Sequence, residues 1–197
     1  MYLKAEHVSK SYHGRKLYDD LSFSMSDGDR LLITGASGTG KTTLVRLILG
    51  LEKPDSGSIL TDCRRNRRGI LRAGCVFQED RLAGDFSPVE NILYADGYSH
   101  EDTGKVRKLL LKLLPEKSLN QRTAELSGGM KRRVSIARAL LLRSDVLIFD
   151  EPFSGLDQEN REKCLRLMLQ EQGRRMLILT AHDHSGEFPD FTEIRCR

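Results

Sequence analysis

The sequence lacks any apolar run that approaches the ~20 residues needed to cross a bilayer. Its first ten residues, MYLKAEHVSK, have no apolar core of the kind found in secretory signals, so the chain is expected to stay in the cytoplasm. Its few cysteines show neither the paired spacing of a metal site nor the framework of a secreted domain, which favours reduced structural thiols. They are Cys63, Cys75, Cys164 and Cys196.

Neither polar nor apolar residues dominate the composition. Hydrophobic residues make up 39% and charged residues 30% of the 197 positions, which argues against a disordered or membrane-embedded chain. The net charge of +4 is too small to indicate nucleic acid, and no such partner is expected. The basic run RRNRR at 64–68 is interpreted as a solvated loop rather than a binding patch. Without internal repeats or linkers, residues 1–197 are expected to form one domain.

Short apolar segments alternate with helical ones along the chain. This alternation is typical of an α/β protein in which crossover helices connect the strands of a parallel sheet. The expected strands are 30–34, 145–149 and 175–180, and the expected helices are 41–50, 102–114, 131–142 and 158–172.

The segment GASGTGKT at 35–42 matches the P-loop pattern in full and lies between an expected strand and an expected helix. Its small residues let backbone N–H groups surround phosphates, and the helix N-terminus adds the positive end of its dipole. Lys41 is expected to neutralise the outer phosphates and the Thr42 hydroxyl to reach Mg²⁺. The expected nucleotide contacts here are Gly35, Ala36, Ser37, Gly38, Thr39, Gly40, Lys41, Thr42 and Thr43.

Two later segments indicate which family of P-loop proteins the chain resembles. The sequence LSGGM at 126–130 places a serine and two glycines at a helix N-terminus, where a hydroxyl and N–H groups can face an anion. The sequence VLIFDE at 146–151 is an apolar strand that ends in two carboxylates, Asp150 and Glu151. Together they resemble the signature and Walker B motifs of the ABC ATPases.

This resemblance implies ATP as the nucleotide, Mg²⁺ as the cofactor and a set of roles. Asp150 would support Mg²⁺, and Glu151 would act as general base on the attacking water. Gln78 matches the family glutamine that lies near Mg²⁺ and hinges the helical subdomain. His182 matches the histidine that contacts the γ-phosphate and orients Glu151. The expected catalytic residues are therefore Lys41, Gln78, Glu151 and His182. The residues expected to hold Mg²⁺ are Thr42, Gln78 and Asp150.

The remaining family positions concern nucleotide binding. Tyr12 matches an aromatic residue that stacks on adenine. Asp157 lies in a segment that resembles the family D-loop. In ABC ATPases two copies pack head to tail, and each ATP lies between the P-loop of one and the signature of the other. The resemblance therefore places Ser127, Gly128 and Gly129 in the site of a second copy.

The matching motifs extend from Tyr12 to His182. The resemblance implies a P-loop NTPase fold with a RecA-like core, an N-terminal antiparallel β portion and an inserted helical subdomain at about 82–142. Arg132 stands where many relatives have glutamine, and Ala36 where proline is common. The segments 61–74 and 183–197 are short for this family, so the fold is expected to be close to its catalytic minimum.

The expected function is that of an ATPase subunit that powers a membrane transporter. Its partners would be a permease in the membrane and a second copy of itself, with the chain on the cytoplasmic face. The segment 76–82 is similar to importers of nitrate, taurine and other sulfonates, but seven residues identify no cargo. A regulatory switch on a membrane complex, as in cell division, is the alternative. A soluble ABC protein acting on ribosomes or DNA is disfavoured, because its usual tandem domains, coiled coils or zinc modules are absent from this sequence.

Overall fold

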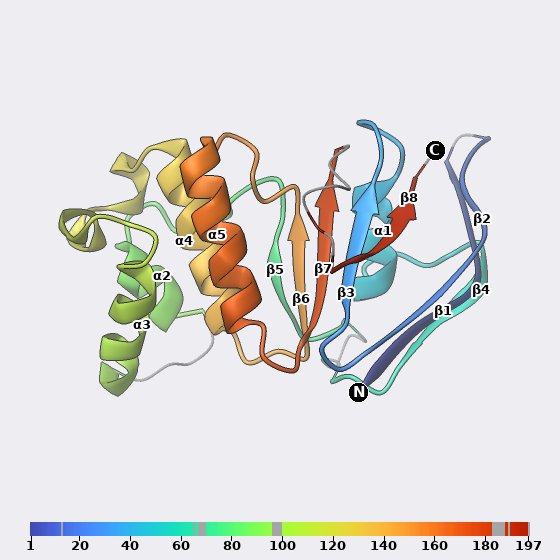
Figure 1. Cartoon of the computed structure of the whole chain (residues 1–197), viewed down its shortest axis with the longest axis horizontal. Helices are drawn as coiled ribbons and strands as arrows, with labels where there is room; N and C mark the ends of the chain where they lie inside the picture. The colour runs from blue at the N-terminus through green and yellow to red at the C-terminus, as the bar shows by residue number, and fades with distance from the viewer. Residues whose placement is uncertain are drawn as a thin grey trace. The chain divides into compact units, whose positions relative to one another are not determined.

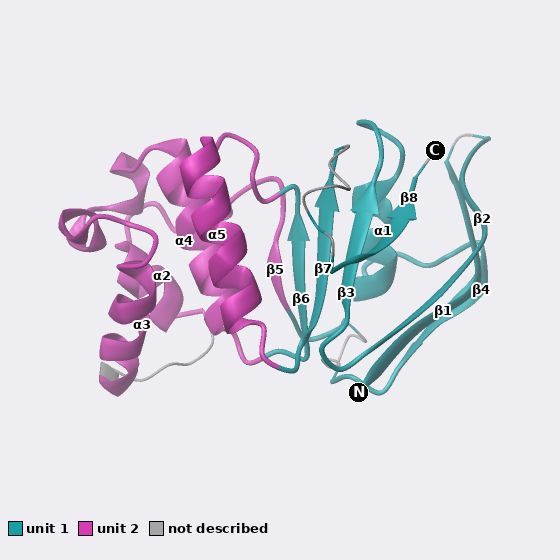
Figure 2. Ribbon diagram, viewed as in Figure 1, with its two compact units in different colours: residues 1–73, 144–151, 174–197 teal, residues 74–143, 152–173 magenta. Residues whose placement is uncertain are grey.

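The computed structural model describes residues 1–12, 14–64, 66, 70–95, 100–182, 188 and 190–196. The chain divides into two compact units (Figure 2). Unit 1 comprises Met1–Ala73, Ser144–Glu151 and Arg174–Arg197, and unit 2 comprises Gly74–Arg143 and Pro152–Gly173. Each unit is therefore built from segments that are far apart in the sequence.

An antiparallel sheet forms the N-terminal part of unit 1 (Figure 1). Its strands are β1 (Tyr2–Tyr12), β2 (Arg15–Ser26) and β4 (Ser56–Thr61), in the order β2-β1-β4. Alternate residues of β1, such as Leu3 and Ala5, are buried while their neighbours are exposed, which is the pattern of a sheet with one face packed. The expected antiparallel β portion is confirmed.

A parallel sheet forms the rest of unit 1. The strands β6 (Val146–Asp150), β7 (Met176–Ala181), β3 (Arg30–Thr34) and β8 (Thr192–Arg195) lie side by side in that order. Every residue of β6 and β7 is buried, as expected for parallel strands covered on both faces. The expected strands are confirmed, although β6 and β7 each begin one residue later than the sequence pattern indicates.

Helix α1 (Lys41–Leu49) follows β3 through the P-loop. Leu44, Val45 and Ile48 are fully buried against the core. The helix ends at Gly50, whose φ of 77° places it in the left-handed region and whose N–H bonds back to the last turn. The expected helix at 41–50 is thus confirmed to within one residue.

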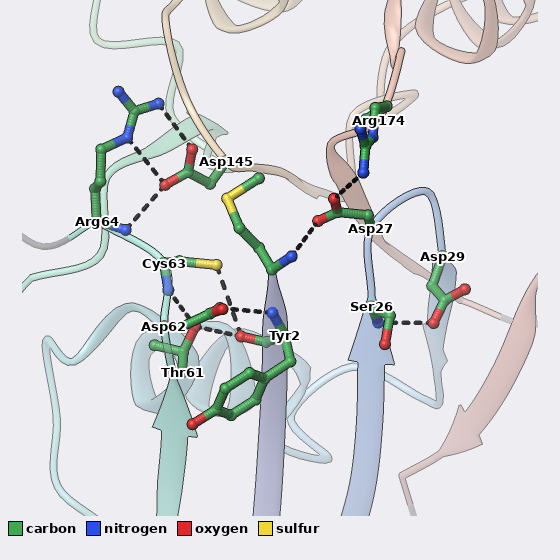
Figure 3. Close-up of polar contacts among 11 residues, drawn as sticks. Tyr2, Ser26, Asp27, Asp29, Thr61, Asp62, Cys63, Arg64, Asp145 and Arg174 are labelled. Atoms are coloured by element: carbon green, nitrogen blue, oxygen red, sulfur yellow. Dashed lines mark hydrogen bonds and ion pairs between the residues drawn. The ribbon is translucent and has the colours of Figure 1, made fainter.

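Polar contacts join the segment that follows β4 to the residue that precedes β6 (Figure 3). Asp145, which precedes β6, accepts hydrogen bonds from the Arg64 backbone N–H at 2.9 Å and from its guanidinium at 2.7 Å. These bonds, with the positive charge of Arg64, lower the pKa of the Asp145 carboxyl and keep it ionised. Arg64, the first residue of the basic run, is exposed and forms an ion pair with Asp145. Arg65, Arg67 and Arg68 lie outside the described residues.

Unit 2 is mostly helical. Strand β5 (Ala73–Val76) begins at the boundary between the units. The α-helices are α2 (Pro88–Leu93), α3 (Thr103–Leu110), α4 (Gly128–Leu141) and α5 (Gln158–Glu171). Short 3₁₀ helices are η1 (His100–Asp102), η2 (Glu116–Asn120) and η3 (Thr123–Glu125). Figure 1 shows α4 and α5 lying alongside each other, and they are in contact.

Two helix boundaries in unit 2 differ from the sequence pattern. The α-helix expected at 102–114 spans only 103–110 and ends in turns, in which the N–H groups of Lys112 and Leu113 bond to carbonyls three residues back, at 3.1 Å and 2.9 Å. The helix expected at 131–142 begins at Gly128, because the Ser127 hydroxyl accepts a hydrogen bond from the Met130 N–H and caps it. Apolar periodicity alone does not reveal such caps.

Candidate active site

The carboxyl ends of three parallel strands bring the expected catalytic residues of unit 1 to one edge. The P-loop follows β3, Asp150 ends β6 with Glu151 next, and His182 follows β7. Asp150 lies directly opposite Thr180 in the register of β6 and β7. Ligands in open α/β sheets bind at this edge.

The P-loop begins and ends on glycines that other residues would not fit. Gly35 has a φ of 147°, and an added Cβ would lie 2.6 Å from the Thr39 hydroxyl. Gly40 has a φ of 104° and precedes α1, whose N-terminus has neither a side-chain cap nor an acidic residue in its first turn. The N–H groups and positive dipole end of α1 therefore suit an anion. Ala36, Ser37 and Gly38 between them are exposed.

Lys41 is buried, with 4% of its surface exposed. Its ammonium donates to the Gly35 carbonyl at 2.8 Å and the Ala36 carbonyl at 3.0 Å, and lies 3.1 Å from a Glu151 carboxylate oxygen. The lysine charge is thus fixed inside the loop beside a carboxylate.

The Asp150 carboxylate is held at both oxygens. The Thr42 hydroxyl donates to one at 2.7 Å, and the Thr180 hydroxyl donates to the other at 2.6 Å. Only 1% of Asp150 is exposed. Since a buried carboxylate is costly unless hydrogen-bonded, these two hydroxyls offset the cost of burying Asp150.

Glu151 adopts a left-handed backbone with a φ of 48°, which is strained for a residue with a side chain. Its N–H donates to the Thr180 hydroxyl at 2.9 Å. Its carboxylate lies between Lys41 at 3.1 Å and the His182 Nε2 at 3.2 Å. Thr180 therefore holds both acidic residues. The sequence analysis missed Thr180, although a threonine among the apolar residues near the end of a strand is a detectable signal.

Tyr12, the residue expected to stack on adenine, lies at the end of β1. Tyr12 is 39% exposed, its hydroxyl donates to the Glu52 carboxylate, and the Lys10 ammonium lies 5.2 Å from the ring centroid. A ring fixed at its hydroxyl and still exposed can stack on a base.

The signature residues and Asp157 belong to unit 2. Ser127 caps α4, and an added Cβ at Gly129 would lie 3.3 Å from the Leu156 side chain, so a small residue fits best there. Asp157 caps α5 by accepting from the Asn160 N–H at 2.8 Å, and this bond lowers the pKa of its carboxyl.

Gln78 also belongs to unit 2 and follows β5 by two residues. The Arg132 guanidinium donates to the Phe77 and Gln78 carbonyls and lies 3.2 Å from the Asp80 carboxylate. Arg132 lies on α4 and therefore fixes the backbone around Gln78 to this helix.

Unit 1 thus brings together Lys41, Thr42, Asp150, Glu151 and His182. The parts that Gln78, Ser127, Gly128, Gly129 and Asp157 play in a nucleotide site remain predictions. In the part of the chain that the structure describes, no cluster of three or more His, Cys, Asp or Glu side chains is suited to a metal ion.

A P-loop after β3, a histidine after the neighbouring strand β7 and two carboxylates at the end of the next strand, β6, define an ATP-hydrolysing nucleotide-binding domain of the ABC type. Residues 18–154 match the family described as "ABC transporter". The chain therefore belongs to the ABC transporter family.

Two relatives are named Nod factor export ATP-binding protein I. The chain is 38% identical to the one from Paraburkholderia xenovorans, covering 90% of this chain and 62% of the relative. It is 39% identical to the one from Rhizobium etli, covering 89% of this chain and 58% of the relative. The chain thus spans about three fifths of the length of these relatives.

Solved structures show the same fold. A dimeric ATP-binding cassette in a post-hydrolysis state with ADP and Pi is 26% identical, with a TM-score of 0.83 over 99% of this chain and 94% of that one. A bacterial Atm1-family ABC exporter with ATP bound is 28% identical, with a TM-score of 0.80 over 100% of this chain and 37% of that one. These likenesses confirm the P-loop NTPase fold. None of the described helices is long and apolar enough to span a membrane.

The double role of Thr180 generates a stability prediction. Thr180→Val keeps the branched shape but removes the hydroxyl that serves Asp150 and the Glu151 N–H. We expect the free energy of unfolding to fall by about 1–3 kcal/mol, because a buried carboxylate loses a donor. Thr180→Ser, which keeps the hydroxyl, should lose clearly less. Urea unfolding at neutral pH measures both, and equal losses would assign the effect to packing instead.

Proposed function

We propose that this chain is the ATP-binding and ATP-hydrolysing subunit that powers a membrane ABC transporter. The observation that carries the proposal is the convergence of a buried P-loop lysine, a buried aspartate and a strained glutamate at one sheet edge. We further propose that both units belong to one ABC domain spanning residues 1–197.

The residues present fit a magnesium–ATP complex. The uncapped N-terminus of α1 suits phosphate oxygens, and the Lys41 ammonium can exchange its loop carbonyls for them. The Thr42 hydroxyl and the Asp150 carboxylate, 2.7 Å apart, are the hard oxygen donors that Mg²⁺ prefers. Mg²⁺ supplies charge neutralisation on the phosphates. Tyr12 would stack on the adenine, and Thr42 and Asp150 would hold the metal, with Gln78 as the further metal residue that the family resemblance implies.

In the proposed mechanism Glu151 is the general base. Its backbone is fixed by Thr180, and its carboxylate is oriented by Lys41 and His182. It accepts a proton from the water that attacks the γ-phosphate, while His182 contacts that phosphate. Lys41 stabilises negative charge on the outer phosphates.

The proposed site is completed by a second copy of the chain. Ser127, Gly128, Gly129 and Asp157 contact the nucleotide held by the P-loop of the opposite subunit. Support comes from the cap geometry of Ser127 and the similarity to a dimeric cassette. ATP binding favours the closed dimer, and hydrolysis releases it.

The membrane partner is proposed from the family. The chain would act at the cytoplasmic face of a membrane together with an integral-membrane permease. The sequence left the direction of transport open, and the relatives named above are export proteins, which supports export. The alternative, a regulatory switch on a membrane complex, keeps the ATPase but uses the dimerisation as a signal.

The first functional prediction separates binding from turnover. Glu151→Gln preserves the shape of the side chain but removes the base, so ATP binding should persist while turnover falls about a hundredfold or more. Lys41→Ala should weaken binding itself. Nucleotide affinity and phosphate release are measured for both variants, and normal turnover in Glu151→Gln would remove Glu151 from its role.

The composite site predicts complementation between two inactive proteins. In a Glu151→Gln background, one version also carries Lys41→Ala and the other Ser127→Arg. Each alone should fail to dimerise with ATP and Mg²⁺, since both of its sites are damaged. Their mixture should form a heterodimer with one intact site, visible by size-exclusion chromatography.

A normal dimer of the Ser127→Arg version on its own would show that the signature lies outside the nucleotide interface. The Glu151→Gln parent serves as the dimerising control.

The transporter proposal predicts a membrane partner. Native chain, cross-linked in cells and recovered from membranes, should carry an integral-membrane protein, and vesicles containing both should couple ATP hydrolysis to solute movement. A partner whose complex hydrolyses ATP but moves no solute would favour the regulatory alternative. Recovery from the soluble fraction only, with no membrane partner, would contradict both.

A further inference from the structure

A chain of hydrogen bonds within unit 1 connects β8 and β2 to the P-loop. Tyr18, on β2, is buried with 6% of its surface exposed. Its hydroxyl donates to the Gly40 carbonyl at 2.8 Å and lies 3.2 Å from the Cys196 sulfur. Cys196 is also buried and follows β8 directly. The antiparallel sheet, the parallel sheet and the P-loop therefore meet at one phenol.

The direction of these bonds follows from the groups involved. A carbonyl oxygen only accepts, so the single phenol proton of Tyr18 goes to Gly40, and the Cys196 thiol donates to the phenol oxygen. Burial raises the pKa of the Tyr18 phenol and of the Cys196 thiol, so both stay protonated at neutral pH. Consecutive bonds of this kind strengthen one another.

The phenol acts on a peptide group that faces the phosphate site. The Gly40 carbonyl and the Lys41 N–H share one planar peptide and point in opposite directions. The carbonyl also accepts from the Leu44 N–H at 2.9 Å, in the first turn of α1. A second donor from Tyr18 fixes this plane, and it thereby fixes the Lys41 N–H at the end of the helix that suits phosphate.

Cys196 braces the other end of the same loop. Its N–H donates to the Thr34 carbonyl at 2.7 Å. An added Cβ at Gly35 would lie 2.7 Å from the Cys196 carbonyl oxygen, so the start of the loop packs directly on Cys196. Tyr18 and Cys196 therefore hold the two ends of the loop, Gly35 and Gly40.

We propose that Tyr18 is a positioning residue for the phosphate-binding loop, braced by Cys196, and that this pair tunes the affinity for nucleotide phosphates. The proposal rests on the proposed function, because it requires ATP to bind at the P-loop. Neither side chain belongs to the P-loop, signature or Walker motifs.

The test uses the full chain and single-atom changes. Tyr18→Phe removes only the hydroxyl, and we expect the Kd for ATP and the KM to rise about three- to tenfold, with kcat changed less than twofold. Cys196→Ala should raise the Kd by a smaller factor, and Cys196→Ser, which keeps a donor, should restore most of the affinity. Tyr2→Phe, at an exposed tyrosine of the same sheet, is the matched control and should bind as the parent does.

The outcomes separate this proposal from the function on which it rests. A parent chain that does not bind ATP contradicts the proposed function. A parent that binds ATP, with Tyr18→Phe equal to it in Kd and KM, overturns the positioning role alone. A lower melting temperature with unchanged KM would show that Tyr18 is only structural, and this also overturns it. Should Tyr18→Phe fail to fold, the contrast between Cys196→Ala and Cys196→Ser decides.

Discussion

The buried carboxylate of Asp150 is the constraint on which the candidate site depends. A charge in a strand whose every residue is buried costs several kcal/mol unless donors surround it. Thr42 from the helix after the P-loop and Thr180 from the neighbouring strand supply those donors. The same bonds fix the start of α1 and the end of β7 against β6. The hydrogen bonds to Asp150 therefore also align α1 and β7 with β6.

Glu151 takes its geometry from this arrangement. Its N–H bonds to the hydroxyl that also serves Asp150, and its backbone is left-handed. A strained residue persists only where its surroundings fix it, and here Thr180, Lys41 and His182 do so. Strand β6 ends at Asp150, and the carboxylate of Glu151 lies 3.1 Å from the Lys41 ammonium.

In unit 2, Arg132 attaches the segment around Gln78 to helix α4. Arg132 is long enough to reach two backbone carbonyls and a carboxylate beside Gln78. Its planar guanidinium satisfies all of them while remaining 6% exposed. Through these partners, the buried guanidinium of Arg132 holds the Gln78 segment against α4.

The sequence alone determined the local features: the P-loop between a strand and a helix, the apolar strand that ends in Asp150 and Glu151, and the signature serine before a helix. These features depend on short residue spacings and on apolar periodicity, both of which can be read directly from the amino-acid sequence. Only the tertiary structure decided that Thr180 serves two carboxylates, that Arg64 pairs with Asp145, and that Tyr18 and Cys196, 178 positions apart, meet beside the P-loop. The end of α3 at Leu110 also depended on backbone hydrogen bonds, and the start of α4 at Gly128 on the Ser127 cap. Contacts between residues remote in sequence follow from strand order and register, which no local pattern specifies.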